Sequence, residues 1–250
     1  MTDGSGADKA PYQLQVGPLE VSECERSALI HHATLGMEFL ARFGPGFLAA
    51  YHRAWVRSPF GLALAARDHQ GRLVGVMLGS LDPGSHYKAM LAQSGPLLAV
   101  RMVASAATRP RLAYQLVVTR SGRYARALLR HLEARFTVER QENEDSRDAA
   151  TAGSDSTTKS WKVGEITHLM VDPALQRFGA GRALVDRTVE LARSAGLDKL
   201  VLVTPPDMAA RRFYEALGWI AGEDVTSRSG EKFVSYSRLL SERSAGASGA

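Results

Sequence analysis

The sequence predicts an α/β protein in which helices flank a mixed β-sheet, and three observations support this fold class. The 250 residues, 45% hydrophobic and 23% charged, are typical of a globular protein with a sizeable core. Two apolar stretches, 62–66 and 73–81, flank a polar turn with a glycine and predict a β-hairpin. Strand, helix and strand patterns follow at 163–171, 181–195 and 200–204, which predicts parallel pairing with a right-handed crossover.

Periodicity and turn residues predict the other elements. The helix at 181–195 has an apolar stripe and an opposite charged side, so we expect it to cover one face of the sheet, and Gly196 ends it. Gly218 ends a later helix in the same way. The further elements are a strand at 12–16, helices at 22–40, 45–56 and 208–217, and a final strand pair around Trp219 and 233–239.

One domain with an insertion is the predicted organisation. Residues 12–242 form the domain, between flexible tails at 1–11 and 243–250. Within it, 84–136 is a helical insertion that carries nine Lys or Arg residues against one acid, a net charge of +8, while the rest of the chain sums to −3. The segment 137–160 has one large aliphatic residue among many Ser, Thr, Asp and Glu residues, so it is expected to be a disordered loop.

Several functional classes are disfavoured by composition. The single cysteine, Cys24, cannot form an internal disulfide, and no Cys/His cluster has zinc spacing, so a cytoplasmic protein without a metal is expected. The polar N-terminus does not resemble a signal peptide. The most apolar stretch, 89–107, is interrupted by polar residues and is shorter than the roughly 20 apolar residues of a membrane span.

A glycine-containing turn precedes the helix at 181–195 and reads Gln176-Arg177-Phe178-Gly179-Ala180-Gly181. Glycines allow a tight turn, and the free N–H groups at a helix start favour a phosphate or pyrophosphate. An ordinary tight turn is an equally good interpretation of these residues alone. A P-loop is excluded because Lys-Ser/Thr does not follow Gly181, and the spacing fits a dinucleotide fold poorly.

A second motif, which begins at Asp207, reads DMAARRFYEALGW. Together with Gln176, Gly179 and Gly181, it resembles the Gcn5-related N-acetyltransferase (GNAT) superfamily, whose motifs are Arg/Gln-x-x-Gly-x-Gly/Ala and Asn-x-x-Ala-x-x-Phe/Leu-Tyr-x-x-x-Gly-Phe. The resemblance is clearest over 161–240, and the stretch 40–59 with the Arg-rich insertion is similar to a bacterial subgroup with an enlarged helical cap.

The resemblance implies a mostly antiparallel, twisted sheet whose two central parallel strands splay apart, with acetyl-CoA bound between them. Pantetheine would follow the first of these strands and the pyrophosphate would lie on the loop. Asp207 stands where the family has Asn, so a role as helix N-cap is an alternative to CoA contact. The implied CoA-binding residues are Leu169, Met170, Val171, Gln176, Arg177, Phe178, Gly179, Ala180, Gly181, Arg182, Asp207, Ala210 and Phe213.

Two catalytic residues are implied by the same resemblance. Tyr214 occupies the position of the general acid that protonates the CoA thiolate, and the alternative is an aromatic core residue. Glu165 occupies a position that is acidic in histone-acetylating members and is the candidate base, with a solvated strand-start glutamate as the alternative. The two-residue period of a strand points His168 away from Glu165, as a core histidine, and the pair His31-His32 is interpreted as surface.

The predicted function is therefore transfer of an acetyl group from acetyl-CoA to a primary amine of a small molecule, such as an aminosugar or another anionic metabolite. A catalytically silent acetyl-CoA-binding module and a protein N-acetyltransferase are the alternatives. Nucleic-acid binding is not expected because the basic insertion has no aromatic stacking platform. Arg123, Arg126 and Arg130 share one predicted helix face, which suits an anionic acceptor, an anionic surface or solvent, and a homodimer is compatible with the sequence.

Overall fold

The computed structural model describes residues 13–115, 161–206, 209–226 and 232–240. The chain divides into two compact units, Met1–Ser105 with Trp161–Ala250, and Ala106–Ser160. The sheet and the candidate site belong to the first unit, and α4 (Pro110–Gln115) belongs to the second. Four sets of sequence predictions lie outside the described residues: the two tails, the loop at 137–160, Asp207, and the arginines Arg123, Arg126 and Arg130.

A seven-stranded sheet in the order β1-β2-β3-β4-β5-β7-β6 forms the centre of the first unit. The strands are β1 (Gln15–Pro18), β2 (Gly61–Arg67), β3 (Leu73–Ser80), β4 (Val163–Val171), β5 (Lys199–Thr204), β6 (Ile220–Thr226) and β7 (Lys232–Leu239). Neighbouring strands pair antiparallel except β4 and β5, which pair parallel. The mixed α/β class, the hairpin and the parallel central pair predicted from the sequence are confirmed.

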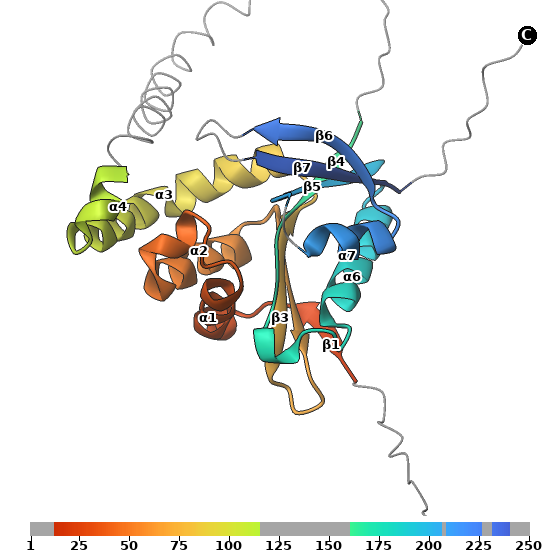
Figure 1. The fold of residues 1–250 in the computed structure, drawn as a ribbon, viewed down its shortest axis with the longest axis horizontal. Helices are drawn as coiled ribbons and strands as arrows, with labels where there is room; N and C mark the ends of the chain where they lie inside the picture. Colours follow the sequence, from red (N-terminus) through yellow and green to blue (C-terminus); the bar gives the residue numbers. More distant parts are fainter. Residues whose placement is uncertain (1–12, 116–160, 207–208, 227–231, 241–250) are drawn as a thin grey trace, which may run out of the picture. The chain divides into compact units, whose positions relative to one another are not determined.

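Helices cover both faces of the sheet (Figure 1). One face carries α1 (Cys24–Thr34), α2 (Pro45–Arg57) and α3 (Pro83–Ala107), and the other carries α6 (Ala180–Ser194) and α7 (Ala210–Ala216). Three 3₁₀ turns lie between these elements: η1 (Val21–Glu23), η2 (Leu40–Phe43) and η4 (Pro173–Leu175). Within the described ranges, no helix combines the length and the apolar character needed to cross a bilayer.

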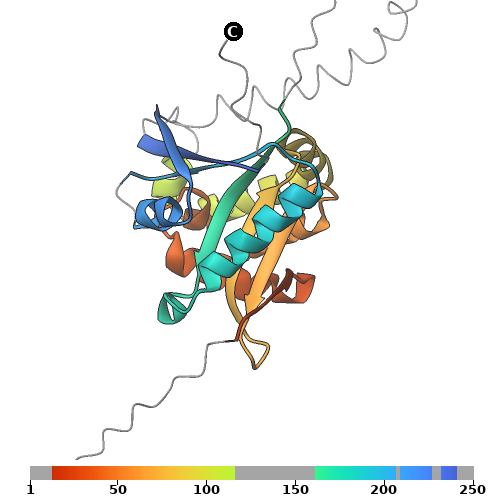
Figure 2. The same cartoon turned by 90° about the vertical axis from the view of Figure 1, so that its right-hand side faces the viewer.

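The hydrophobic core between α6 and the sheet explains why this segment forms a helix that packs on the sheet. Leu184, Val185, Val189 and Ala192 are all at most 3% exposed and repeat at helical spacing, so they bury one stripe of α6. This stripe joins a hydrophobic cluster with β2, β3, β4 and β5. Figure 2, seen from the α6 side, shows the helix running along the sheet.

The first helix is shorter than the predicted 22–40, because α1 ends at Thr34. At Gly36 a Cβ atom would lie 2.7 Å from the carbonyl oxygen of His32, so only glycine fits the turn that follows. The chain then turns, with the N–H of Glu38 donating to the carbonyl of Leu35. This turn directs Glu38 back toward the sheet, where it contacts β4.

β4 departs from a regular strand at two points. Its pairing with β3 shifts between Ile166 and His168, so Thr167 is an extra residue, a β-bulge. Its pairing with β5 covers only Val163–Ile166 against Lys199–Leu202. Beyond Ile166, β4 continues along β3 while β5 continues along β7, so the two central strands separate as expected.

Candidate active site

The gap between β4 and β5 leaves backbone groups of β4 without a neighbouring strand. The N–H of Asp172 donates to the carbonyl of Val74 at 2.9 Å. Because the direction of bonding alternates in an antiparallel ladder, Met170 bonds toward β3, and the N–H and C=O groups of Leu169 and Val171 point away from β3. The carbonyl of Val171 accepts from Oγ1 of Thr34 at 3.2 Å and from Nε2 of Gln176 at 3.4 Å, so the N–H of Val171 and both groups of Leu169 are the ones that face the gap. The gap therefore presents an edge onto which an extended amide-containing ligand can pair.

The glycine-containing loop lies at the end of this edge. Two left-handed residues, Arg177 (φ 69°) and Gly179 (φ 88°), turn the chain into α6, which begins at Ala180 without a side-chain cap. The first turn of α6 contains no acidic residue, so its free N–H groups favour an anion. Gln176, Arg177, Phe178, Gly179 and Arg182 are exposed, Gly181 is half-buried and Ala180 is buried.

The start of α6, the end of β4 and α7 meet at one point. A Cβ atom on Gly181 would lie 3.5 Å from Cζ of Phe213 and 3.7 Å from Cγ2 of Val171. Ala210, one turn before Phe213, is half-buried. Residues predicted to bind acetyl-CoA thus come together from three elements separated in the sequence.

Tyr214 lies beside this point, on the α6 side of the sheet. It is 6% exposed, and its ring lies 5.7 Å from that of Trp219 and 6.1 Å from that of Tyr236, measured between centroids. Burial raises the pKa of Tyr214, so the phenol is protonated at neutral pH. Burial alone accounts for this shift in the pKa, with no contribution from a hydrogen bond to a described side chain.

Glu165 lies on the other side of the sheet, toward α3. The hydroxyl of Thr167 donates to its carboxylate at 3.4 Å, and the Tyr87 hydroxyl also hydrogen-bonds it. Burial raises the pKa of Glu165 and these hydrogen bonds oppose the rise, but the net direction is upward. A carboxylate with a raised pKa is a better proton acceptor than an ordinary glutamate.

A cavity of about 360 Å³ opens next to Glu165. Its other walls come from the face of β5 and β7 that points away from α6, including Val201, Ser235 and Ser237. Lys199 also lines it. A hydrophobic floor with hydroxyls, one carboxylate and one amine is typical of a pocket for a small polar molecule.

His168 lies on the same side of the sheet as Glu165, and the prediction that it points to the opposite side is wrong. Its Nε2 is 3.3 Å from the hydroxyl of Tyr51 in α2. Burial raises the pKa of Tyr51, and the nearby carboxylate of Glu165 raises it further. Glu165 and His168 therefore both lie near this tyrosine. The physical reason is the bulge, because the extra residue Thr167 resets the alternation of side chains.

The interpretation of His31 as a surface residue is also wrong. His31 is fully buried, whereas its neighbour His32 is exposed as predicted. The buried ring stacks on His52, with centroids 5.1 Å apart.

Comparisons with known proteins agree with this geometry. Residues 144–219 match the model of the acetyltransferase (GNAT) family, a stretch that contains the loop, α6 and Tyr214. This stretch, about a third of the chain, is therefore similar to the GNAT superfamily. A mycothiol acetyltransferase from Beutenbergia cavernae is 43% identical over 58 residues, which are 23% of this chain and only 20% of that relative.

Two solved structures share the GNAT fold at low sequence identity. The ribosomal-protein-S18-alanine N-acetyltransferase from Escherichia coli has a TM-score of 0.51 at 12% identity, covering 95% of this chain and 100% of its own. The protein yncA from Salmonella typhimurium, solved with its cofactor acetyl-CoA, has a TM-score of 0.50 at 15% identity, covering 93% and 96%. At these identities, the two similarities are evidence for the fold alone.

The GNAT motifs did not reveal every side chain around the gap. Tyr87 and Thr167, which hydrogen-bond Glu165, were missed, as was Tyr51. Tyr51 and Trp55 lie one turn apart on α2, and both are buried. An aromatic residue on an amphipathic helix gives no sequence signal that separates a core position from a site wall, so only the fold assigns these contacts.

Proposed function

We propose that this protein transfers an acetyl group from acetyl-CoA to a primary amine of a small molecule by direct attack of the amine on the thioester. The observation that carries the proposal is the gap between β4 and β5, with Tyr214 on one side of the sheet and Glu165 on the other. The acceptor amine can then approach the acetyl carbon from the Glu165 side of the sheet, while the departing thiolate faces Tyr214.

Acetyl-CoA, the acetyl donor, would bind along the open edge of β4. The pantetheine amides would pair with Leu169 and with the N–H of Val171, which face the gap, and Met170 anchors the strand as a fully buried residue. The pyrophosphate would rest on the N–H groups of residues 176–182 at the start of α6. Phe213 and Ala210 would line the side of the same channel.

The proton transfers follow from the two catalytic candidates. The ammonium form of the acceptor loses a proton to Glu165, directly or through a water, and the free amine attacks the acetyl carbon. The carbon–sulfur bond breaks, and the Tyr214 hydroxyl donates its proton to the departing thiolate. The buried phenol has not released this proton beforehand, because burial disfavours the phenolate.

The cavity next to Glu165 supports a small acceptor. Its volume of about 360 Å³ lies at the lower end of the range for small-molecule sites. Ser235 and Ser237 offer hydroxyls to a polyol or sugar, and Lys199 offers a positive charge to an anionic group.

The test is acetyl transfer by the full chain across a panel of aminosugars, polyamines, amino acids and peptide N-termini, with CoA release and product mass as readouts. Tyr214→Phe should lower kcat by about 10²- to 10⁴-fold while acetyl-CoA affinity is unchanged, because the hydroxyl acts only as thiolate charge develops. Tyr114→Phe, at an exposed tyrosine of α4, is the matched control.

Two results would contradict this assignment. Tight acetyl-CoA binding without turnover on any amine would identify a silent binding module. Full activity of Tyr214→Phe would show that another group or solvent protonates the thiolate.

A further inference from the structure

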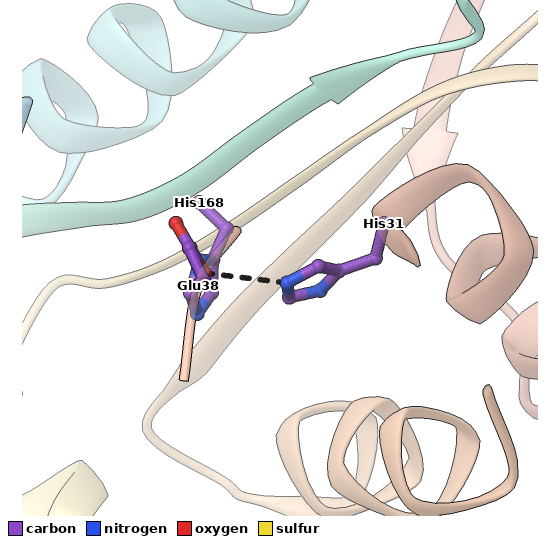
Figure 3. Close-up of side chains that lie close together, drawn as sticks. All are labelled: His31, Glu38 and His168. Carbon is purple, nitrogen blue, oxygen red and sulfur yellow. Dashed lines mark hydrogen bonds and ion pairs between the residues drawn. The ribbon is translucent and has the colours of Figure 1, made fainter. Parts of the chain in front are cut away.

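A second cluster of reactive side chains lies among α1, the turn before η2, and β4. Nε2 of His31 and Nδ1 of His168 lie 3.4 Å and 3.5 Å from the same oxygen, Oε2 of Glu38. All three atoms lie within 4.8 Å of one another. Figure 3 shows the three side chains together, with the contact between His31 and Glu38 drawn as a dashed line.

The spacing of these atoms suits a coordination sphere, because the two contacts are long for hydrogen bonds. A charge-assisted hydrogen bond between imidazole and carboxylate has a donor–acceptor distance of about 2.7–2.9 Å. In a tetrahedral zinc site with bonds of about 2.0–2.1 Å, neighbouring ligand atoms are separated by roughly 3.3–3.5 Å. The separations of 3.4 and 3.5 Å from Glu38 are close to two edges of such a tetrahedron, and the third separation, between the two nitrogens, is at most 4.8 Å.

A buried nitrogen without a partner gives an independent indication of a ligand. His168 is 8% exposed, and its Nδ1 has no hydrogen-bond partner among the described residues, although it is aimed at Glu38. Its Nε2, 3.3 Å from the Tyr51 hydroxyl, holds the ring in this orientation. When Nε2 carries the proton and donates to Tyr51, Nδ1 presents a lone pair to the cluster.

His31 is oriented by a similar outer contact. Its Nδ1 is 2.9 Å from Nε2 of His52, and Nδ1 of His52 is 2.7 Å from Oγ of Ser27. With N–H groups donating from His31 to His52 and from His52 to Ser27, Nε2 of His31 also presents a lone pair to Glu38. Metal-bound histidines are commonly fixed in this way by a partner on the second nitrogen.

We propose that His31, Glu38 and His168 bind one Zn²⁺ ion. Two imidazoles with one carboxylate suit zinc, whereas Ca²⁺ and Mg²⁺ prefer oxygen ligands throughout. Glu38 is 38% exposed, so solvent reaches the cluster and a water could supply a further ligand. The sequence did not predict this site, because His31 and Glu38 are far from His168 along the chain and no zinc spacing results.

The experiment uses the full chain without a histidine tag, treated with a chelator and dialysed. Zn²⁺ is titrated by calorimetry, and thermal unfolding is followed with and without the metal. One Zn²⁺ per chain should bind, and it should raise Tm by mass action. Glu38→Ala removes a partly exposed ligand, and it should weaken binding at least tenfold and abolish the Tm shift.

His32→Ala is the matched control, since this exposed histidine is adjacent to His31 and outside the cluster. It should bind Zn²⁺ as the wild type does. Co²⁺ should give the intense visible absorption of a tetrahedral site in the wild type and in His32→Ala, but not in Glu38→Ala. Absence of stoichiometric binding, or equal affinity in wild type and Glu38→Ala, would overturn the proposal.

Discussion

Replacing Gly181 with glutamate places a negative charge where the pyrophosphate is proposed to lie. Gly181 is in the first turn of α6, and its φ is outside the left-handed region. A Cβ atom there would make ordinary van der Waals contacts, at 3.5 Å to Phe213 and 3.7 Å to Val171. The fold therefore accepts a side chain at this position, and the main effect of Gly181→Glu should fall on the ligand.

The expected magnitude follows from charge repulsion and mass action. Two like charges about 4 Å apart repel by about 4 kcal/mol at an effective dielectric constant of 20, which is roughly a thousandfold in Kd. Acetyl-CoA at 100 times the wild-type Kd stabilises the fold by about 2.7 kcal/mol, or roughly 5–10 °C in Tm for a protein of this size. At the same concentration the variant would gain about 0.06 kcal/mol, a shift below about 1 °C.

Thermal unfolding with increasing acetyl-CoA measures this difference directly. Gly181→Ala is the control, because it adds the Cβ without the charge and alanine favours the helix. Its ligand-induced shift should remain close to that of the wild type. An unchanged shift in Gly181→Glu would refute the placement of the pyrophosphate at this loop, and lost binding in both variants would indicate a steric effect.

Two further predictions concern the base and the core. Because burial raises the pKa of Glu165, activity measured as kcat/KM should fall with decreasing pH at a pKa above the usual glutamate range. Glu165→Gln should remove this acid limb and recover activity at high pH, where the amine is already deprotonated. An unchanged pH profile would exclude Glu165 as the base. Leu184→Ala, at a fully buried core position, should cost about 2–5 kcal/mol in urea unfolding, against about 0.5 kcal/mol or less for the exposed Leu91→Ala. Equal costs would contradict the packing of α6.

Local patterns in the sequence determined much of the fold. The bounds of β4 agree with the predicted strand at 163–171, and α6 and β5 each begin one residue before the predicted position. The turn before α6 was also found from its glycine, and Gly179 indeed adopts a left-handed conformation. These features were predictable because periodicity, helix ends and backbone conformation depend mainly on residues close in the sequence.

The tertiary structure alone decided which side chains face each other around the site. An extra residue at Thr167 brings His168 to the same side as Glu165, and a strand's two-residue period cannot reveal where a bulge interrupts it. The turn at Gly36 similarly carries Glu38 to His168, a residue more than a hundred positions away. Side-chain direction depends on pairing with a neighbouring strand, and that partner is chosen by the packing of the whole sheet.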